Sequence, residues 1–133
     1  MNVRPFNPDR DSPAEVSKLN TWPPVWQEWM ALQYAGPFPY HNLLIAEEGG
    51  ELVGCLHILD GGLPWTILDG MYLKPAYRSL ANARQLGLAG EEELKHRGVS
   101  VFLVNAPVQL GRVLQRYGMV ALGQDFTMLG KVL

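Results

Sequence analysis

The chain has 133 residues, 47% of them hydrophobic and 18% charged, with a formal net charge of −2 and a pI of about 5.9. This length predicts one domain, residues 1–133, whose core needs no disulfide or metal. Lysines and arginines are scattered rather than gathered in a basic stripe, which argues against a nucleic-acid partner. No stretch approaches the roughly 20 apolar residues of a membrane span, and residues 1–5 lack the apolar core of a signal peptide, so we expect a cytoplasmic protein.

Cysteine and histidine give no sign of a metal site. The single cysteine, Cys55, forms no internal bridge, which is typical of a reducing compartment, and we expect it to be buried and inert. The three histidines lack partners at the spacing of metal ligands. His57 lies in an apolar run, where it could serve as a base near neutral pH, although a half-buried structural histidine is the commoner case.

The N-terminal third is irregular and rich in proline. Residues 1–6 predict a short strand that Pro5 restricts to a sheet edge or strand end. Residues 9–19 and 24–35 each predict a helix, the second with Pro24 early in it and Gly36 just past its end. Several aromatic residues lie in or near this second segment: Trp22, Trp26, Trp29, Tyr34, Phe38 and Tyr40.

The middle of the chain predicts three strands. Residues 42–47 and 51–59 are apolar runs joined across Glu48, Gly49 and Gly50, which is a hairpin signal because glycine supplies the positive φ of a tight turn. Residues 65–73 predict the third strand. Gly70 inside that strand indicates a bulge or a close backbone approach.

The C-terminal half alternates helices and strands. Residues 81–97 have helical periodicity, with Ala83, Leu86, Gly90 and Leu94 on one face, and Gly98 ends the helix. Residues 100–104 predict a buried strand, residues 107–117 a helix, and residues 124–133 a last strand. The strand–helix–strand step around residues 81–97 predicts two parallel neighbouring strands.

This order of elements resembles that of the GNAT (Gcn5-related N-acetyltransferase) superfamily. The resemblance is densest over residues 71–78, 91–99 and 114–119, where a strand, a proline turn, Arg78, a long helix and an Arg97-Gly98-Val99 sequence follow in the family's order. It implies an α/β fold with a mixed, mostly antiparallel sheet. A central parallel strand pair would be splayed around a cofactor wedge and flanked by helices.

The resemblance also implies a cofactor site for acetyl-CoA. Pantetheine would pair with the strand of Met71, Tyr72 and Leu73. The pyrophosphate would lie on the loop Arg78, Ser79, Leu80, Ala81, Asn82 and Ala83, with Asn105 also near the cofactor. Ala81 stands where the family has its central glycine, so its Cβ would narrow the phosphate site unless the backbone there is already helical. Ser79 and Asn82 could compensate by donating hydrogen bonds.

The residues at the catalytic positions that the resemblance implies depart further from the family's pattern. The tyrosine that protonates the leaving thiolate would fall at Leu114, which can donate no proton. Tyr117 lies about 60° away on the helix and could replace it if the helix is locally tightened; a core aromatic is the alternative. Asp69 could be the general base, as a central-strand carboxylate, or it could cap a backbone amide beside Gly70.

We therefore expect an acyl-CoA-dependent N-acyltransferase acting on a small-molecule or protein amine. The alternative is a catalytically degenerate GNAT fold, of the kind that phages encode, which binds a partner without turnover. The aromatic residues 22–40 could line the acceptor site, belong to the core, or form a homodimer interface.

Overall fold

The computed structural model describes residues 1–12, 15–16, 42–60, 66–106, 108–122 and 128–133. The predicted helix over residues 24–35 and the aromatic residues 22–40 lie outside these residues. Of the predicted helix over residues 9–19, residues 15–16 are helical. Within the described residues, no helix is long and apolar enough to span a membrane.

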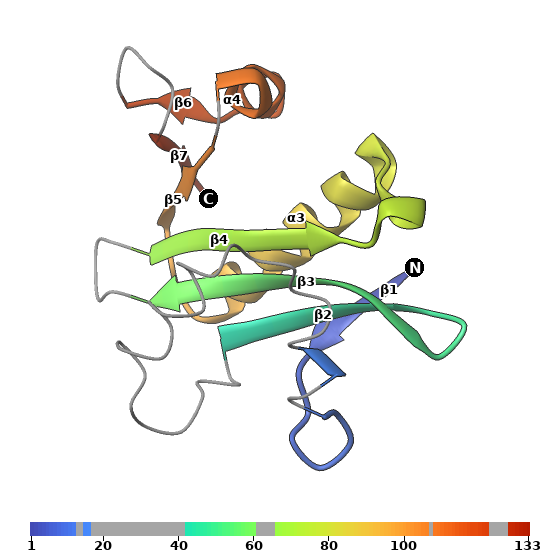
Figure 1. Cartoon of the computed structure of the whole chain (residues 1–133). Helices are drawn as coiled ribbons and strands as arrows, with labels where there is room; N and C mark the ends of the chain where they lie inside the picture. Colours follow the sequence, from blue (N-terminus) through green and yellow to red (C-terminus); the bar gives the residue numbers. More distant parts are fainter. Residues whose placement is uncertain (13–14, 17–41, 61–65, 107, 123–127) are drawn as a thin grey trace, which may run out of the picture.

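One seven-stranded sheet organises the described part of the chain, in the order β1-β2-β3-β4-β5-β7-β6 (Figure 1). Neighbours are antiparallel except for β4 and β5, which are parallel as predicted. Two helices, α3 (Leu80–His96) and α4 (Val108–Gln115), and a short 3-10 turn, η2 (Pro75–Tyr77), complete the described elements. The strands are β1 (Asn2–Pro5), β2 (Leu43–Glu48), β3 (Glu51–Asp60), β4 (Thr66–Leu73), β5 (Val101–Asn105), β6 (Val120–Ala121) and β7 (Met128–Val132).

The hairpin between β2 and β3 confirms the glycine signal. Gly49 and Gly50 have φ values of 57° and 83°, and Glu48 pairs directly with Glu51. Two consecutive residues with positive φ match the right-handed twist of the strands, which is why two glycines here predict a hairpin so specifically.

A bulge in β4 confirms the prediction at Gly70. Cys55 pairs with Tyr72 and His57 pairs with Asp69. The advance of two residues from Cys55 to His57 in β3 therefore lies opposite an advance of three residues between Tyr72 and Asp69 in β4. The extra residue lies between Asp69 and Tyr72. β3 approaches β4 closely just beyond this point, because a Cβ at Gly54 would lie only 2.6 Å from the carbonyl oxygen of Tyr72. The bulge therefore bends the strand that the resemblance assigns to the cofactor.

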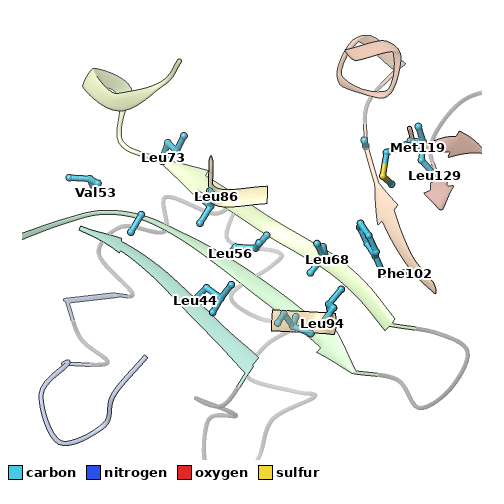
Figure 2. Packing of buried hydrophobic residues seen from close by; sticks show 13 residues of the cluster. Leu44, Val53, Leu56, Leu68, Leu73, Leu86, Leu94, Phe102, Met119 and Leu129 are labelled. Atoms are coloured by element: carbon cyan, nitrogen blue, oxygen red, sulfur yellow. The ribbon is translucent and has the colours of Figure 1, made fainter. Parts of the chain in front are cut away.

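The helix α3 (Leu80–His96) packs across β3 and β4 (Figure 1). Its predicted inner face is confirmed: Leu86 and Leu94 are fully buried, and Figure 2 shows them among the leucines of β2, β3 and β4. Gly90 allows this close contact, since a Cβ there would lie 2.6 Å from Leu56 Cδ2. This cluster forms the main core.

A second apolar cluster lies on the opposite face of the sheet. It consists of Phe6, Val16, Leu43, Ile45 and Cys55. His57 shares this face, because it pairs directly with Leu43 and alternates with the α3-facing residues Leu56 and Ile58. The side chain of His57 is buried, with 4% of its surface exposed.

The boundaries of several elements differ from the predictions. α3 begins at Leu80, one residue before the predicted start, because Ser79 caps it. α4 (Val108–Gln115) is shorter than predicted, since its last turn tightens before Gly118. The two-residue strand β6 was not predicted, because two residues carry no periodic signal.

Candidate functional site

The parallel strands β4 and β5 separate in the middle of the sheet. They pair only over three positions, Thr66 with Phe102 through Leu68 with Val104. Beyond Leu68, β4 continues to Leu73, while β5 turns away from it towards α4 (Figure 1). Within the described residues, the backbone edge of β4 past Leu68 therefore has no strand partner on the β5 side. An extended molecule could hydrogen-bond along that edge as an additional strand would.

A pocket of about 430 Å³ adjoins this separation. It follows α3 from Leu80 to Glu91, which corresponds to about 16 Å along the helix axis. Its wall is predominantly apolar, and its volume is that of a small-molecule site. The other lining residues come mainly from α3, β4, β5 and the α4 region, among them Met71, Ala83, Gly87, Leu110, Val113, Leu114 and Tyr117.

The turn between β4 and α3 is held by side chains that were predicted to contact phosphate. Arg78 Nε donates to the carbonyl oxygen of Leu73 at 2.9 Å, and the guanidinium carbon lies 5.6 Å from the centre of the Tyr72 ring. Asn82 Nδ2 donates to the carbonyl oxygen of Tyr77 at 2.9 Å. These contacts show that Arg78 and Asn82 fix the path of the chain into the helix.

The first turn of α3 presents open backbone amides. Ser79 is extended, with φ −132° and ψ 157°, and its Oγ accepts a hydrogen bond from the amide of Asn82 at 3.1 Å. The amides of Leu80 and Ala81 find no acceptor within the described part of the chain. No acidic side chain lies in this turn. Such a helix end attracts anions, because its N–H groups and its dipole both favour negative charge.

Ala81 is the second residue of α3, so its backbone is helical. The sequence left open whether this position needs the positive φ of a glycine. Because the backbone at position 81 is helical, alanine fits here without strain. The loop from Arg78 to Ala83 therefore keeps the conformation of a helix start despite the substitution.

The structure brings part of the predicted cofactor set together. Met71, Leu80 and Ala83 line the same pocket. Asp69 lies in β4 immediately before the bulge, and Asn105 is the last residue of β5. The side chains of these two residues lie outside what the structure describes.

Tyr117 lines the pocket from its other side. The end of α4 is tightened there, since the amide of Tyr117 donates to the carbonyl oxygen of Leu114 at 2.9 Å, a span of three residues. Gly118, with φ 88°, then ends the turn. Leu114 also lines the pocket, so the tightening brings Tyr117 to the same wall. The tyrosine is 39% exposed and is therefore no buried core residue.

Three charged pocket residues were not predicted as site residues. The guanidinium carbon of Arg84 lies 5.4 Å from the centre of the Tyr117 ring. Lys131 Nζ lies 2.9 Å from both carboxylate oxygens of Glu91. The side chain of Glu91 is only 15% exposed, because Lys131 lies against it from β7. The two are 40 positions apart in sequence, so only the sheet topology reveals the pair.

Cys55 is not a candidate nucleophile. It is buried on the face opposite α3, and burial alone raises the pKa of its thiol to about 12. A thiol with such a pKa is protonated at neutral pH and weakly reactive. The expectation that Cys55 is buried is confirmed.

Comparisons with known proteins identify the family to which the chain belongs. Residues 7–113 match the sequence model of the acetyltransferase (GNAT) family. A comparison with curated proteins finds no match. An acetyltransferase from Streptococcus agalactiae has a similar structure, with a TM-score of 0.73 at 13% identity over 99% of this chain and 98% of that one.

Two further structures were solved with the cofactor. A GNAT family acetyltransferase from Elizabethkingia anophelis, with acetyl-CoA bound, gives a TM-score of 0.70 at 11% identity, covering 99% of this chain and 97% of that one. The PaiA N-acetyltransferase from Thermoplasma acidophilum, in complex with coenzyme A, gives 0.64 at 15% identity over 99% and 98%. At these identities the similarity establishes a shared fold.

Proposed function

The chain belongs to the acetyltransferase (GNAT) family, and we propose that the separation of β4 from β5 is where it binds acetyl-CoA. Membership makes it an acyl-CoA-dependent N-acyltransferase with acetyl-CoA as co-substrate. One observation carries the location: the strands part after Leu68, directly beside an apolar pocket that begins at the open end of α3.

The donor would lie along β4 and end at α3. Pantetheine would hydrogen-bond to the backbone of Met71 and Leu73, and its apolar parts would fill the adjoining pocket. The pyrophosphate would accept hydrogen bonds from the amides of Leu80 and Ala81. Ser79, Arg78 and Asn82 would act mainly by fixing this turn, through the contacts they already make.

The reaction is a transfer of the acetyl group from sulfur to nitrogen. The neutral amine nitrogen attacks the thioester carbonyl carbon, a C–N bond forms, and the C–S bond breaks. Coenzyme A leaves as a thiolate that takes up a proton, and the new amide nitrogen loses one to a base. We propose Asp69 or a water molecule as that base and Tyr117 as the proton donor. Holding amine and thioester in line can by itself lower the barrier by about 7–11 kcal/mol.

The non-catalytic alternative is not favoured. Its support in sequence was the loss of the family's glycine, tyrosine and asparagine together, and a helical Ala81 removes the steric argument at the glycine position. Tyr117, which lines the same pocket as Leu114, would offset the loss of tyrosine at position 114.

The test is release of free coenzyme A thiol from acetyl-CoA in the presence of amines. The panel should include small polyamines, amino sugars, and peptides with a free N-terminus or lysine, because the acceptor could be a small molecule or a protein. We expect amine-dependent thiol release for one class and none without enzyme. Acetyl-CoA at 100 times its Kd should also add about 2.7 kcal/mol to the free energy of unfolding. Absence of both effects would contradict the proposal.

A further inference from the structure

The inner end of the pocket lies where β4 and β5 join. A Cβ at Gly87 would lie 3.6 Å from Met71 Cε, and a Cβ at Gly90 would lie 3.1 Å from Leu68 Cδ1. As α3 advances, the pocket therefore runs back along β4 from Met71 towards Leu68. Leu68 is the last residue of β4 that pairs with β5. The pocket thus continues past the unpaired edge of β4 and ends at the junction of the two strands.

The wall of this inner end is apolar and comes from the core. Four buried side chains contribute to it (Figure 2): Leu56, Leu68, Phe102 and Met119. None of them carries a nitrogen or oxygen atom, and a water molecule in a pocket needs about two to four polar partners. An apolar group is therefore the favoured occupant, because burial removes its surface from water.

An ion pair closes the inner end of the pocket. Lys131 Nζ lies 2.9 Å from both carboxylate oxygens of Glu91, and both residues line the pocket. Lys131 pairs in the sheet with Phe102, which lies opposite the first of the three β4 residues that pair with β5. The ion pair is therefore at the closed side of the junction. An apolar tail that extended past it would have to separate the two charges or remove them from water, and both are costly.

We propose that the protein transfers acyl groups longer than acetyl as well as acetyl, with the acyl tail in this inner end and the Glu91–Lys131 pair as its length limit. The assignment rests on the proposed function and names the class of donor: coenzyme A thioesters of straight, saturated acyl groups of medium length. The bonds made and broken are those of acetyl transfer. The amine nitrogen bonds to the carbonyl carbon and displaces the thiolate of coenzyme A, which takes up a proton, while the new amide nitrogen loses one to the base.

The geometry sets the length of the acyl group. Pantetheine paired with Met71 and Leu73 would occupy the outer part of the pocket, so the thioester would lie beside Met71. From Gly87, which faces Met71, α3 advances about 6 Å to Glu91. An extended chain advances about 1.3 Å per bond, so about five bonds cover this distance. A hexanoyl group therefore reaches the ion pair, and a longer group meets it.

Calorimetric titration of the folded full chain with acyl-coenzyme A thioesters tests the inner end without an acceptor amine. Each buried methylene should tighten binding by up to about fourfold, so hexanoyl-CoA should bind at least tenfold more tightly than acetyl-CoA. Octanoyl-CoA should gain nothing over hexanoyl-CoA. Equal affinity for acetyl-CoA and hexanoyl-CoA overturns the proposal. A steady gain through octanoyl-CoA and decanoyl-CoA also overturns it, because it would mean that the tail binds outside a closed site.

Variants of the ion pair test the length limit. Glu91→Leu combined with Lys131→Leu removes both charges together, so octanoyl-CoA should then bind at least fivefold more tightly than hexanoyl-CoA. Glu91→Gln leaves the ammonium of Lys131 without its carboxylate. This variant should prefer adipoyl-CoA to hexanoyl-CoA at least tenfold, because the terminal carboxylate of adipoyl reaches that ammonium. The parent should prefer hexanoyl-CoA.

The matched control is Glu92→Leu combined with Lys95→Leu. It removes an exposed ion pair of the same helix that does not line the pocket, and it should keep the parent's preference for acyl length. Parental preferences in both folded Glu91 variants overturn the proposal. Thiol release with an amine that supports acetyl transfer should also occur with hexanoyl-CoA, and its absence overturns this proposal alone. A parent protein that binds no acetyl-CoA would instead overturn the proposed function together with it.

Discussion

Arg4 joins two carboxylates that are far apart in the sequence. Its guanidinium nitrogens lie 2.7 and 2.8 Å from the two oxygens of Asp11, and its Nε lies 3.2 Å from Glu47. The Asp11 side chain is only 6% exposed. These contacts tie the segment after β1 to β2, beside the second apolar cluster.

Asp11→Asn should lower the free energy of unfolding at pH 7 by about 1.5–3 kcal/mol, the usual contribution of hydrogen bonds to a charged group. The hydrogen bonds from Arg4 hold the pKa of Asp11 below its ordinary value. A carboxyl whose pKa is lower in the folded state contributes stability above its unfolded pKa of about 3.9, and this is lost as the pH falls through the folded value. The acid decline of stability should therefore be shallower in the variant.

Urea unfolding between pH 2 and pH 7 measures this effect. Asp9→Asn, at an exposed position of the same segment, is the control and should follow the parent. An Asp11→Asn chain that loses as much stability on acidification as the parent would contradict the assignment.

The roles of some single residues could be predicted from the sequence and those of others could not, for a physical reason. Gly98 and the pair of glycines at 49 and 50 act on their neighbours in the chain, so their roles could be predicted. The Glu91–Lys131 pair depends on which strand lies beside α3, and the conformation of Ala81 depends on a helix boundary one residue away. Neither feature can be predicted from the pattern of neighbouring residues in the sequence.

Two glycines of α3 illustrate how an element fits its sheet. Gly87 faces the pocket, and a Cβ there would lie 3.6 Å from Met71 Cε, an ordinary contact. Gly90 faces the core, where a Cβ would lie 2.6 Å from Leu56 Cδ2 and 3.1 Å from Leu68 Cδ1. A Cβ would therefore be accommodated at position 87, whereas three residues later the absence of a Cβ allows close packing.

Gly87→Ala and Gly90→Ala should change stability in opposite directions. Both gain up to about 1 kcal/mol of helix propensity. Gly87→Ala keeps that gain, whereas Gly90→Ala also forces the core leucines to shift, at a cost of about 1–3 kcal/mol. Chemical denaturation of both variants and the parent gives the comparison. A Gly90→Ala chain as stable as Gly87→Ala would show that α3 does not pack on the sheet as described.

Elements with strong periodicity could be predicted from sequence. The hairpin, the inner face of α3 and the bulge at Gly70 each have a local cause that the residues reveal. β6 could not be predicted, because it exists only through its pairing with Leu129 and Gly130 of β7. The sequence predicts only that Tyr117 can replace the tyrosine missing at position 114 if the end of α4 is tightened. The spacing to Gly118 alone does not distinguish a regular last turn of the helix from a tightened one.

For the whole molecule, the decisive feature is a sheet that opens at its centre. Two parallel strands that pair over three residues and then part leave unpaired backbone and an apolar pocket in one place. The strand–helix–strand order of the sequence predicted the parallel pair. The family resemblance predicted that these two strands separate. The pocket's charges became visible only when α3, α4 and β7 were placed around it.

The most direct test of this account is calorimetric titration of coenzyme A into Gly87→Leu. The added side chain would extend from α3 into the pocket while favouring the helix. We predict that the parent binds coenzyme A and that Gly87→Leu binds at least tenfold more weakly. Glu92→Leu, on the solvated face of the same helix, should bind as the parent does. Parental affinity in a folded Gly87→Leu chain would contradict the claim that acyl-CoA occupies this pocket.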